Sequence, residues 1–162
     1  MKKIFLGLGD MGATRTQGQE LRTLALGSCV ALIMMDPKAR CIAMVHVVLP
    51  ESSIDPARSQ KKPGHFADTA VPALLEEMKK LGSDNVGKGM IIKLVGGANV
   101  MDPNNTFNIG KRNALAIKKA LWKFGMGPRA EDIGGRISRS VSVDVDTGKV
   151  KITSPGRDGW EL

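Results

Sequence analysis

The apolar residues of this chain occur in short runs separated by turn-forming residues, a pattern that predicts several strands and a few helices. Two runs of strand length, residues 30–35 and 42–49, flank the sequence DPKA. Such an arrangement predicts a β-hairpin, and a further strand is expected before it at residues 21–24. The remaining strands are predicted at 90–95, 137–145 and 150–153.

Two segments space their apolar residues as an amphipathic helix does. The first begins at Asp68 or Thr69 and stops at Gly82, and the second runs from about residue 108 to 124. Residues 50–65 are polar and interrupted by proline, so we expect a loop there, with His65 at the surface or capping the first helix.

These elements predict one α+β domain, a β-sandwich of mixed or antiparallel sheets flanked by helices. The domain is expected to cover residues 1–153, with residues 154–162 as a loose C-terminal tail. No apolar run approaches the roughly 18 residues that a membrane span needs, so direct membrane insertion is not expected. The two cysteines occupy unlike positions, which suits a reducing compartment and favours the cytoplasm.

The formal net charge of +8 raises the question of an anionic partner. The basic residues are scattered in small groups, aromatic residues make up only 4% of the chain, and tyrosine is absent. The stacking surfaces of single-strand binders are therefore missing, and nucleic-acid binding is the less favoured alternative to an acidic protein partner. Neither a zinc-ligand spacing nor a phosphate loop is present, so no metal or other cofactor is expected.

Cys29 and His46 are the strongest candidates for chemistry. If the hairpin loop has two residues, residues whose numbers sum to 75 face each other, and this would pair Cys29 with His46. Gly27 and Ser28 interrupt the strand and leave backbone N–H groups free to bind a ligand. Two alternatives stay open: a longer turn would change the register, and a cysteine in an apolar strand is by default a core residue, which suits Cys41.

Seven short motifs follow one another along the chain in a recognisable order. They are LALGSCV (24–30), HVVLP (46–50), FAD (66–68), GGA (96–98), IGKRN (109–113), DIGG (132–135) and TGKV (147–150). In order and spacing they resemble the CheD family of chemoreceptor glutamine deamidases, from about residue 11 to residue 152.

The resemblance implies a cysteine-dependent deamidase, a protein-glutamine glutaminase, with a fold like that of the cytotoxic-necrotizing-factor toxins. It also implies two kinds of protein partner. Methyl-accepting chemotaxis receptors would be the substrates, and the phosphatase CheC would be a regulator. An adaptor that binds CheC or a receptor without turnover is the alternative function.

The resemblance places the family's catalytic Cys, His and Thr on Cys29, His46 and Thr23. Cys29 is then the nucleophile, His46 the acid and base, and Thr23 the group that orients the imidazole; a β-branched residue filling a strand is the alternative for Thr23. Ser28 is expected to contact the substrate, beside backbone donors for the oxyanion. We also expect His46 to lower the pKa of the Cys29 thiol below its ordinary value of about 8.5.

Overall fold

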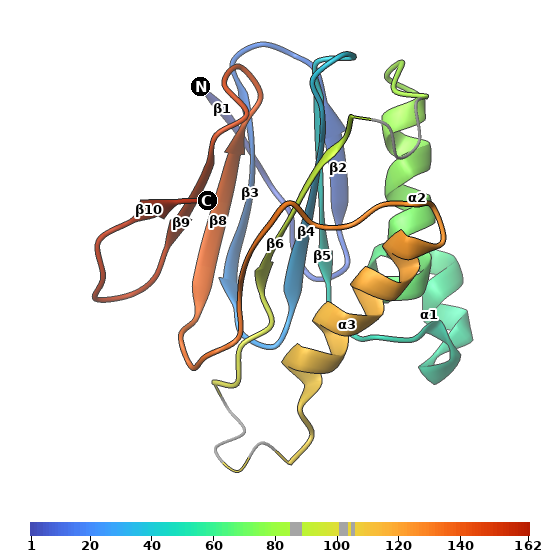
Figure 1. The fold of residues 1–162 in the computed structure, drawn as a ribbon, viewed down its shortest axis with the longest axis vertical. Helices are drawn as coiled ribbons and strands as arrows, with labels where there is room; N and C mark the ends of the chain where they lie inside the picture. The colour runs from blue at the N-terminus through green and yellow to red at the C-terminus, as the bar shows by residue number, and fades with distance from the viewer. Residues whose placement is uncertain (85–88, 101–103, 105) are drawn as a thin grey trace.

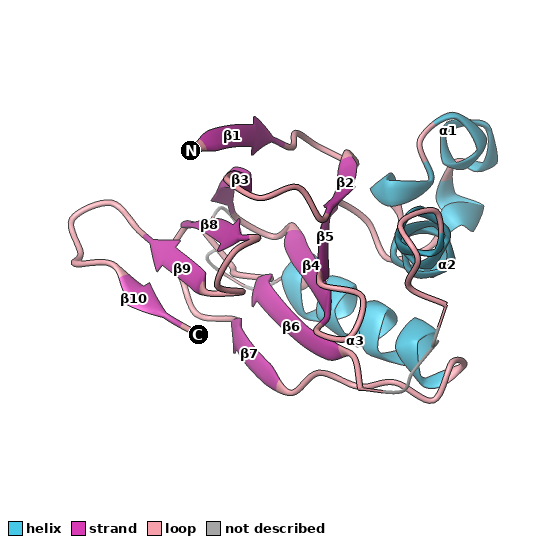
Figure 2. Ribbon diagram, turned by 90° about the horizontal axis from the view of Figure 1, so that it is seen from above, coloured by secondary structure: helices cyan, strands magenta, loops and turns pink. Residues whose placement is uncertain are grey.

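The computed structural model describes residues 1–84, 89–100, 104 and 106–162, and these form three layers (Figure 1). Two five-stranded sheets face each other, and the helices cover the outer face of one of them (Figure 2). The sheet covered by the helices is the inner sheet and the other is the outer sheet. One hydrophobic core lies between the two sheets and a second lies between the inner sheet and the helices. The predicted single α+β domain with two mixed sheets is confirmed.

The outer sheet contains the strands that form one side of the candidate site. Its β1–β3 pair is parallel and its other pairs are antiparallel. In spatial order its strands are β1 (Lys2–Phe5), β3 (Gln19–Leu26), β8 (Arg139–Asp144), β9 (Val150–Thr153) and β10 (Trp160–Glu161).

The inner sheet contains the predicted hairpin. Its β6–β7 pair is parallel and its other pairs are antiparallel. In spatial order its strands are β2 (Met11–Thr14), β5 (Cys41–Val47), β4 (Val30–Asp36), β6 (Ile91–Gly96) and β7 (Ala130–Ile133).

Strand β4 is buried on both faces because it lies in the middle of the inner sheet. Val30, Leu32 and Met34 pack toward the helices, whereas Ala31 and Ile33 pack toward the outer sheet. This double burial explains why the strand has a continuous apolar run instead of alternating polarity.

Two longer helices, α2 (Ala67–Lys79) and α3 (Ile109–Trp122), bury their apolar stripes against the inner sheet. The expected loop at residues 50–65 is wrong, since it contains the short helix α1 (Pro56–Lys61) between two 3₁₀ turns, Ser52–Ile54 and Pro63–His65. Asp55 caps α1 by accepting a hydrogen bond from the Arg58 backbone N–H at 3.1 Å. Among the described residues, no helix combines the length and the apolar character that a bilayer span needs.

The expected loose tail at residues 154–162 is also wrong. Trp160 and Glu161 form β10, which pairs with β9, and the backbone N–H of Leu162 donates to the Val150 carbonyl at 3.0 Å. Trp160 and Leu162 pack against the core between the sheets. The tail is held because the side chains of Trp160 and Leu162 pack there. The composition of the tail, which is rich in proline, glycine and charged residues, does not indicate this packing.

Candidate functional site

The hairpin turn is longer than the two residues assumed from the sequence, and this changes which residue lies opposite His46. Asp36 pairs with Cys41 and Ala31 pairs with His46, so residues 37–40 form a four-residue turn. The expected direct pairing of Cys29 with His46 is therefore wrong by two residues. A shift of two keeps the same face of the sheet, and Cys29, just before β4, packs with Ala31 against the core between the sheets. Cys29 is thus the diagonal neighbour of His46 across the ladder.

Thr23 reaches the same layer from the outer sheet because it lies two residues after Leu21, which packs in the core between the sheets, and a bulge follows it in β3. Thr23 pairs with Val141 and Leu26 pairs with Arg139, so β3 has one extra residue between these pairs. Ala25 takes up this residue with a left-handed φ of 55°. In a regular strand, residues three apart point to opposite faces, but the bulge leaves both Thr23 and Leu26 buried.

A chain of hydrogen bonds fixes the tautomer of His46. The Thr23 hydroxyl donates to the Leu6 carbonyl at 2.7 Å, and its oxygen lies 2.6 Å from His46 Nδ1. A hydroxyl has one proton, which the carbonyl already receives, so Nδ1 must carry the hydrogen and donate it to Thr23. The Leu6 carbonyl is itself held, since the Leu6 backbone N–H donates to the Arg22 carbonyl at 2.8 Å.

The other ring nitrogen of His46, Nε2, is left with its lone pair. Among the described residues, Nε2 is buried and has no hydrogen-bond partner. Burial lowers the pKa of His46, the carboxylate of Asp10 opposes that effect, and His65 adds to it. The imidazole is therefore neutral at neutral pH, and Nε2 is ready to accept a proton.

The turn between β1 and β2 holds the backbone of His46 in place. The Gly9 N–H donates to the His46 carbonyl at 2.8 Å, and the His46 N–H donates to the Asp10 carbonyl at 3.0 Å. The Asp10 side chain pairs with Lys62 at 2.9 Å, and this pairing lowers the pKa of the Asp10 carboxyl. The sequence did not indicate this turn as part of the site, because its signal is only a polar GLGD run between two short strands.

The segment that carries Cys29 is pinned to the end of β6. The Gly97 N–H donates to the Cys29 carbonyl and the Ala98 N–H donates to the Gly27 carbonyl, both at 2.8 Å. Gly96 has φ of 116°, and a Cβ there would lie 2.3 Å from the Cys29 carbonyl oxygen. Only glycine fits this approach, which gives the GGA motif a structural reason.

The thiol of Cys29 differs from the expectation of a lowered pKa. Burial raises the pKa of the Cys29 thiol, with its own backbone N–H opposing that effect. Cys29 and His46 are therefore a neutral thiol and a neutral imidazole, not a preformed thiolate and imidazolium. Cys41 is a core residue as expected, 1% exposed, and burial and the charge of Asp36 raise its pKa to about 11.

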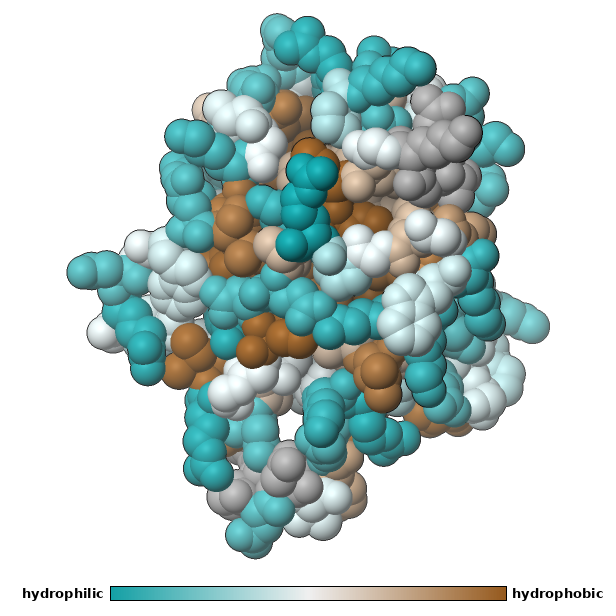
Figure 3. Space-filling view, in the orientation of Figure 1, coloured by the Kyte–Doolittle hydropathy of each residue, from teal (hydrophilic) through white to brown (hydrophobic). Residues whose placement is uncertain are grey.

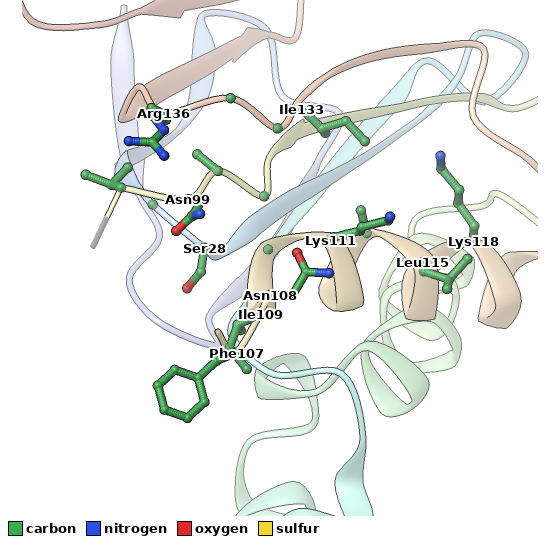
Figure 4. A pocket seen from close by; sticks show the side chains of 18 residues that line it. Ser28, Asn99, Phe107, Asn108, Ile109, Lys111, Leu115, Lys118, Ile133 and Arg136 are labelled. Atoms are coloured by element: carbon green, nitrogen blue, oxygen red, sulfur yellow. The ribbon is translucent and has the colours of Figure 1, made fainter. Parts of the chain in front are cut away.

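A cavity of about 820 Å³ lies beside the Gly27–Cys29 segment. Ser28 lies on its wall between Asn99 and the start of α3, as Figure 4 shows. Leu115 and Lys118 lie farther along α3 at the other end of the cavity (Figure 4). On this side of the molecule, apolar side chains gather in the middle of the surface with hydrophilic side chains around and between them (Figure 3).

His65 is buried close to the site, so the expected surface position is wrong, and the start of α2 has no side-chain cap hydrogen bond from any residue that the structure describes, so the alternative of a capping histidine is wrong as well. His65 is 9% exposed, its ring packs edge-on against Phe66, and Nδ1 has no partner among the described residues. Its carbonyl accepts from the N–H groups of Val48 and Leu49, both at 3.0 Å. In the described part of the chain, no cluster of three or more histidine, cysteine, aspartate or glutamate side chains is arranged to hold a metal ion.

Comparisons with known proteins identify the family to which the chain is similar. A family model described as CheD chemotactic sensory transduction matches residues 48–154. A protein of Syntrophotalea carbinolica named probable chemoreceptor glutamine deamidase CheD is 51% identical over 162 residues, the whole of both chains. The chemoreceptor glutamine deamidase CheD of Thermotoga maritima is 42% identical over 156 residues, 96% of this chain and 94% of that protein. The probable chemoreceptor glutamine deamidase CheD of Solibacter usitatus is 41% identical over 157 residues, 97% of this chain and 92% of that protein.

Proposed function

The chain belongs to the CheD family, and we propose that it hydrolyses glutamine side chains of chemoreceptors to glutamate with Cys29 as the nucleophile. One observation carries the assignment of the site. Thr23 holds His46 so that its buried Nε2 has a free lone pair, in the layer where Cys29 packs. An adaptor without turnover gives no reason to keep such a base unpaired, because a buried acceptor without a donor costs stability.

The first chemical step joins the enzyme to the substrate. The Cys29 sulfur attacks the carbon of the glutamine carboxamide, its proton passes to His46 Nε2, and the carbonyl π electrons move to the oxygen. Because the thiol starts neutral, proton transfer accompanies the attack. The backbone N–H groups of Cys29 and Ser28 are the donors that stabilise the oxyanion.

Collapse of this intermediate releases ammonia. The C–N bond breaks, the departing nitrogen takes the proton from Nε2, and a thioester remains on Cys29. Nε2 then accepts a proton from water, the hydroxide attacks the thioester carbon, and the C–S bond breaks. The proton returns to the sulfur, and the products are glutamate and ammonia. Thr23 holds Nδ1–H throughout, so that Nε2 alone exchanges protons.

The cavity beside Ser28 is the proposed binding site for the receptor segment around the glutamine. Its wall includes the exposed apolar residues Phe107 and Leu115, and also Lys111 on α3. This mixture suits an amphipathic segment that carries acidic residues, and the net charge of +8 favours encounter with such a partner. Ser28 lies where it can contact the carboxamide.

Three further properties follow from family membership as proposals. A CheC-type phosphatase is a second protein partner, the cytoplasm is the compartment, and the sandwich is related to the fold of cytotoxic-necrotizing-factor deamidases. Each has a direct check. Pull-down with purified CheC tests the partner, cell fractionation tests the compartment, and superposition on a toxin structure tests the fold.

The deciding experiment is mass spectrometry of a receptor cytoplasmic fragment incubated with the protein. Each deamidation adds about one mass unit, since an NH₂ group is exchanged for OH. Cys29→Ala is expected to lower the rate by more than about 1,000-fold. Cys41→Ala is the matched control and should keep the parent rate, because Cys41 is buried in the core on the other face of the sheet. Turnover by Cys29→Ala at the parent rate would refute the nucleophile assignment.

A further inference from the structure

Three hydrogen bonds hold every carbonyl of the Gly27–Cys29 segment. Two come from backbone N–H groups at the end of β6. The third comes from Asn113 on α3, whose Nδ2 donates to the Ser28 carbonyl at 3.0 Å. The segment is irregular, lying between β3 and β4, so these bonds and not a sheet ladder determine the orientation of its peptide groups.

The orientation of the Ser28 carbonyl determines where the Cys29 N–H points. The peptide group is planar and trans, so the carbonyl of one residue and the N–H of the next point in opposite directions. With the Ser28 carbonyl directed at Asn113, the Cys29 N–H is directed away from α3. It lies against the Cys29 sulfur, where it opposes the effect of burial on the pKa of the thiol.

Asn113 itself is fully buried, with 0% of its surface exposed. Its second Nδ2 hydrogen donates to the Val48 carbonyl at 2.9 Å. One amide group thus ties the segment that carries Cys29 to the chain two residues beyond His46. Both of its hydrogens point to carbonyl oxygens, which identifies the nitrogen side of the amide and requires a residue with two donors.

The oxygen of the same amide is left without a partner. Among the described residues, Asn113 Oδ1 is buried and accepts no hydrogen bond. A buried unsatisfied acceptor is costly, but turning the amide over to pair Oδ1 would remove both donors from the Ser28 and Val48 carbonyls. The two donated bonds therefore fix the amide in one orientation, and with it the Ser28 carbonyl.

We propose that Asn113 is a positioning residue for catalysis, which fixes the Ser28–Cys29 peptide so that the Cys29 N–H stabilises the oxyanion. The inference rests on the proposed function, in which Cys29 is the nucleophile. Asn113 touches neither substrate nor reacting atoms and acts through the peptide that it holds. Without it, the Ser28 carbonyl is free to rotate, and rotation of that peptide turns the N–H out of the position where negative charge develops.

Two reactions of the same thiol separate this role from a structural one. Deamidation passes through an oxyanion, whereas alkylation of Cys29 by iodoacetamide displaces iodide and forms none. For Asn113→Ala we expect kcat for a receptor fragment to fall about 10- to 100-fold, with KM and the alkylation rate each within about threefold of the parent. Equal losses in deamidation and alkylation would overturn the proposal, as would an unchanged kcat.

Ile117→Ala is the matched control for general damage to α3. Ile117 is also fully buried on this helix, but it packs in the core between the inner sheet and the helices, whereas Cys29 packs against the core between the sheets. It should lower the melting temperature and leave kcat at the parent value below that temperature. If Ile117→Ala loses as much kcat as Asn113→Ala, Asn113 acts only through packing and the proposed positioning role is wrong.

Asn113→Asp decides the matter if Asn113→Ala does not fold. An ionised carboxylate offers no donor to the Ser28 and Val48 carbonyls, whereas a protonated one offers a single donor. The ratio of kcat to the parent value should therefore rise as the pH is lowered. A ratio independent of pH would overturn the proposal. Full activity in Cys29→Ala would refute the proposed function, whereas an inactive Cys29→Ala with a fully active Asn113→Asp would refute only the role of Asn113.

Discussion

At the scale of single residues, the proposed catalysis depends on which nitrogen of His46 carries the hydrogen. Thr23 decides this because its only hydroxyl proton goes to the Leu6 carbonyl. An aspartate in that place would hold the imidazole with a full negative charge and raise its basicity. A hydroxyl fixes the ring with less effect on its charge, which fits a neutral thiol and imidazole pair.

Thr23→Val is expected to lower kcat about 10- to 100-fold while keeping the shape of the side chain. Valine leaves Nδ1 without an acceptor and the Leu6 carbonyl without a donor, and the latter loss should cost about 1–3 kcal/mol of unfolding free energy. Nitrogen NMR of the imidazole should show a mixture of tautomers. Thr23→Ser retains the hydroxyl and is the control. Parent activity in Thr23→Val would mean that the threonine only fills space.

The pH dependence of kcat/KM should follow His46 on the acid side. Because burial lowers the pKa of His46, the ring stays neutral as the pH falls to about 6.5, its ordinary pKa, and becomes charged only below that value. Activity is therefore expected to remain high at pH 6.5 and to fall at lower pH. A decline centred well above pH 6.5 would contradict the neutral pair.

Asp10→Asn tests the direction of the electrostatic effect on the acid limb of the pH profile, the pH range in which activity falls as His46 becomes charged. The Asp10 carboxylate raises the pKa of His46, so its removal should move the acid limb to still lower pH. The proton NMR titration of the His46 ring should shift in the same direction. Lys62→Met removes the partner of Asp10 but keeps the carboxylate. In this variant the acid limb should lie at a pH no lower than in the parent. A shift of the limb upward in Asp10→Asn would contradict the assignment.

At the scale of elements, the site depends on how closely α3 approaches the end of β6. A Cβ on Gly110 would lie 2.5 Å from the backbone carbon and oxygen of Gly97 and 2.7 Å from the Ala98 oxygen. Glycine at this helical position therefore allows the contact that brings Asn113 within hydrogen-bond distance of Ser28. The IGKRN motif thus combines a close packing site with the anchor of the segment that carries Cys29.

Gly110→Ala is expected to lower the unfolding free energy by about 1–3 kcal/mol, although alanine is the better helix former, because backbone atoms cannot move aside easily. The displaced helix should also lower kcat. Gly127→Ala is the control, since no atom of the described residues beyond its chain neighbours lies within 4 Å of a Cβ there, and its effect should stay within about 0.5 kcal/mol. Chemical denaturation measures both variants, and a stabilised Gly110→Ala would show that the helix can shift without cost.

Sequence patterns predicted the elements that are long and well buried, and they failed where position depends on a single residue. β4, β5, α2 and α3 were predicted because their apolar residues are numerous and regular. The register was missed by two because Pro37 belongs to a four-residue turn. β1 was missed because its four residues are mostly exposed. The bulge at Ala25 leaves no pattern, since a bulge moves side chains without changing their kind.

The hairpin pattern indicated Cys29 and His46 and the family resemblance added Thr23, whereas the ionisation of these residues depends on the folded structure. Cys29, His46 and Thr23 stand in segments that resemble the family, and the fold brings them to one layer between the sheets. The expected thiolate was wrong because burial, which the sequence does not display, outweighs the neighbouring N–H. Asn113 was part of a quoted motif, but its role required knowing which carbonyls it faces.

At the scale of the whole molecule, Arg139 joins the two sheets near the site. It lies on β8 of the outer sheet, pairs with Leu26 at the bulge, and is 5% exposed. Its guanidinium donates to Asp132 on β7 of the inner sheet at 2.9 Å and to the Gly134 carbonyl at 2.9 Å. Asp132 also accepts from the Trp160 indole, which ties β10 to the same centre.

Arg139→Met is therefore expected to lower the unfolding free energy by about 2–4 kcal/mol, because it leaves the Asp132 carboxylate without its countercharge and the Gly134 carbonyl without its donor. The midpoint of urea unfolding measures the loss. Adding Asp132→Asn to Arg139→Met should recover part of it, since the unpaired charge is gone while the indole keeps an acceptor. Arg157→Met, an exposed arginine, controls for the loss of one positive charge. If the double variant is less stable than Arg139→Met alone, hydrogen bonding of Asp132 and not its charge dominates the link between the sheets.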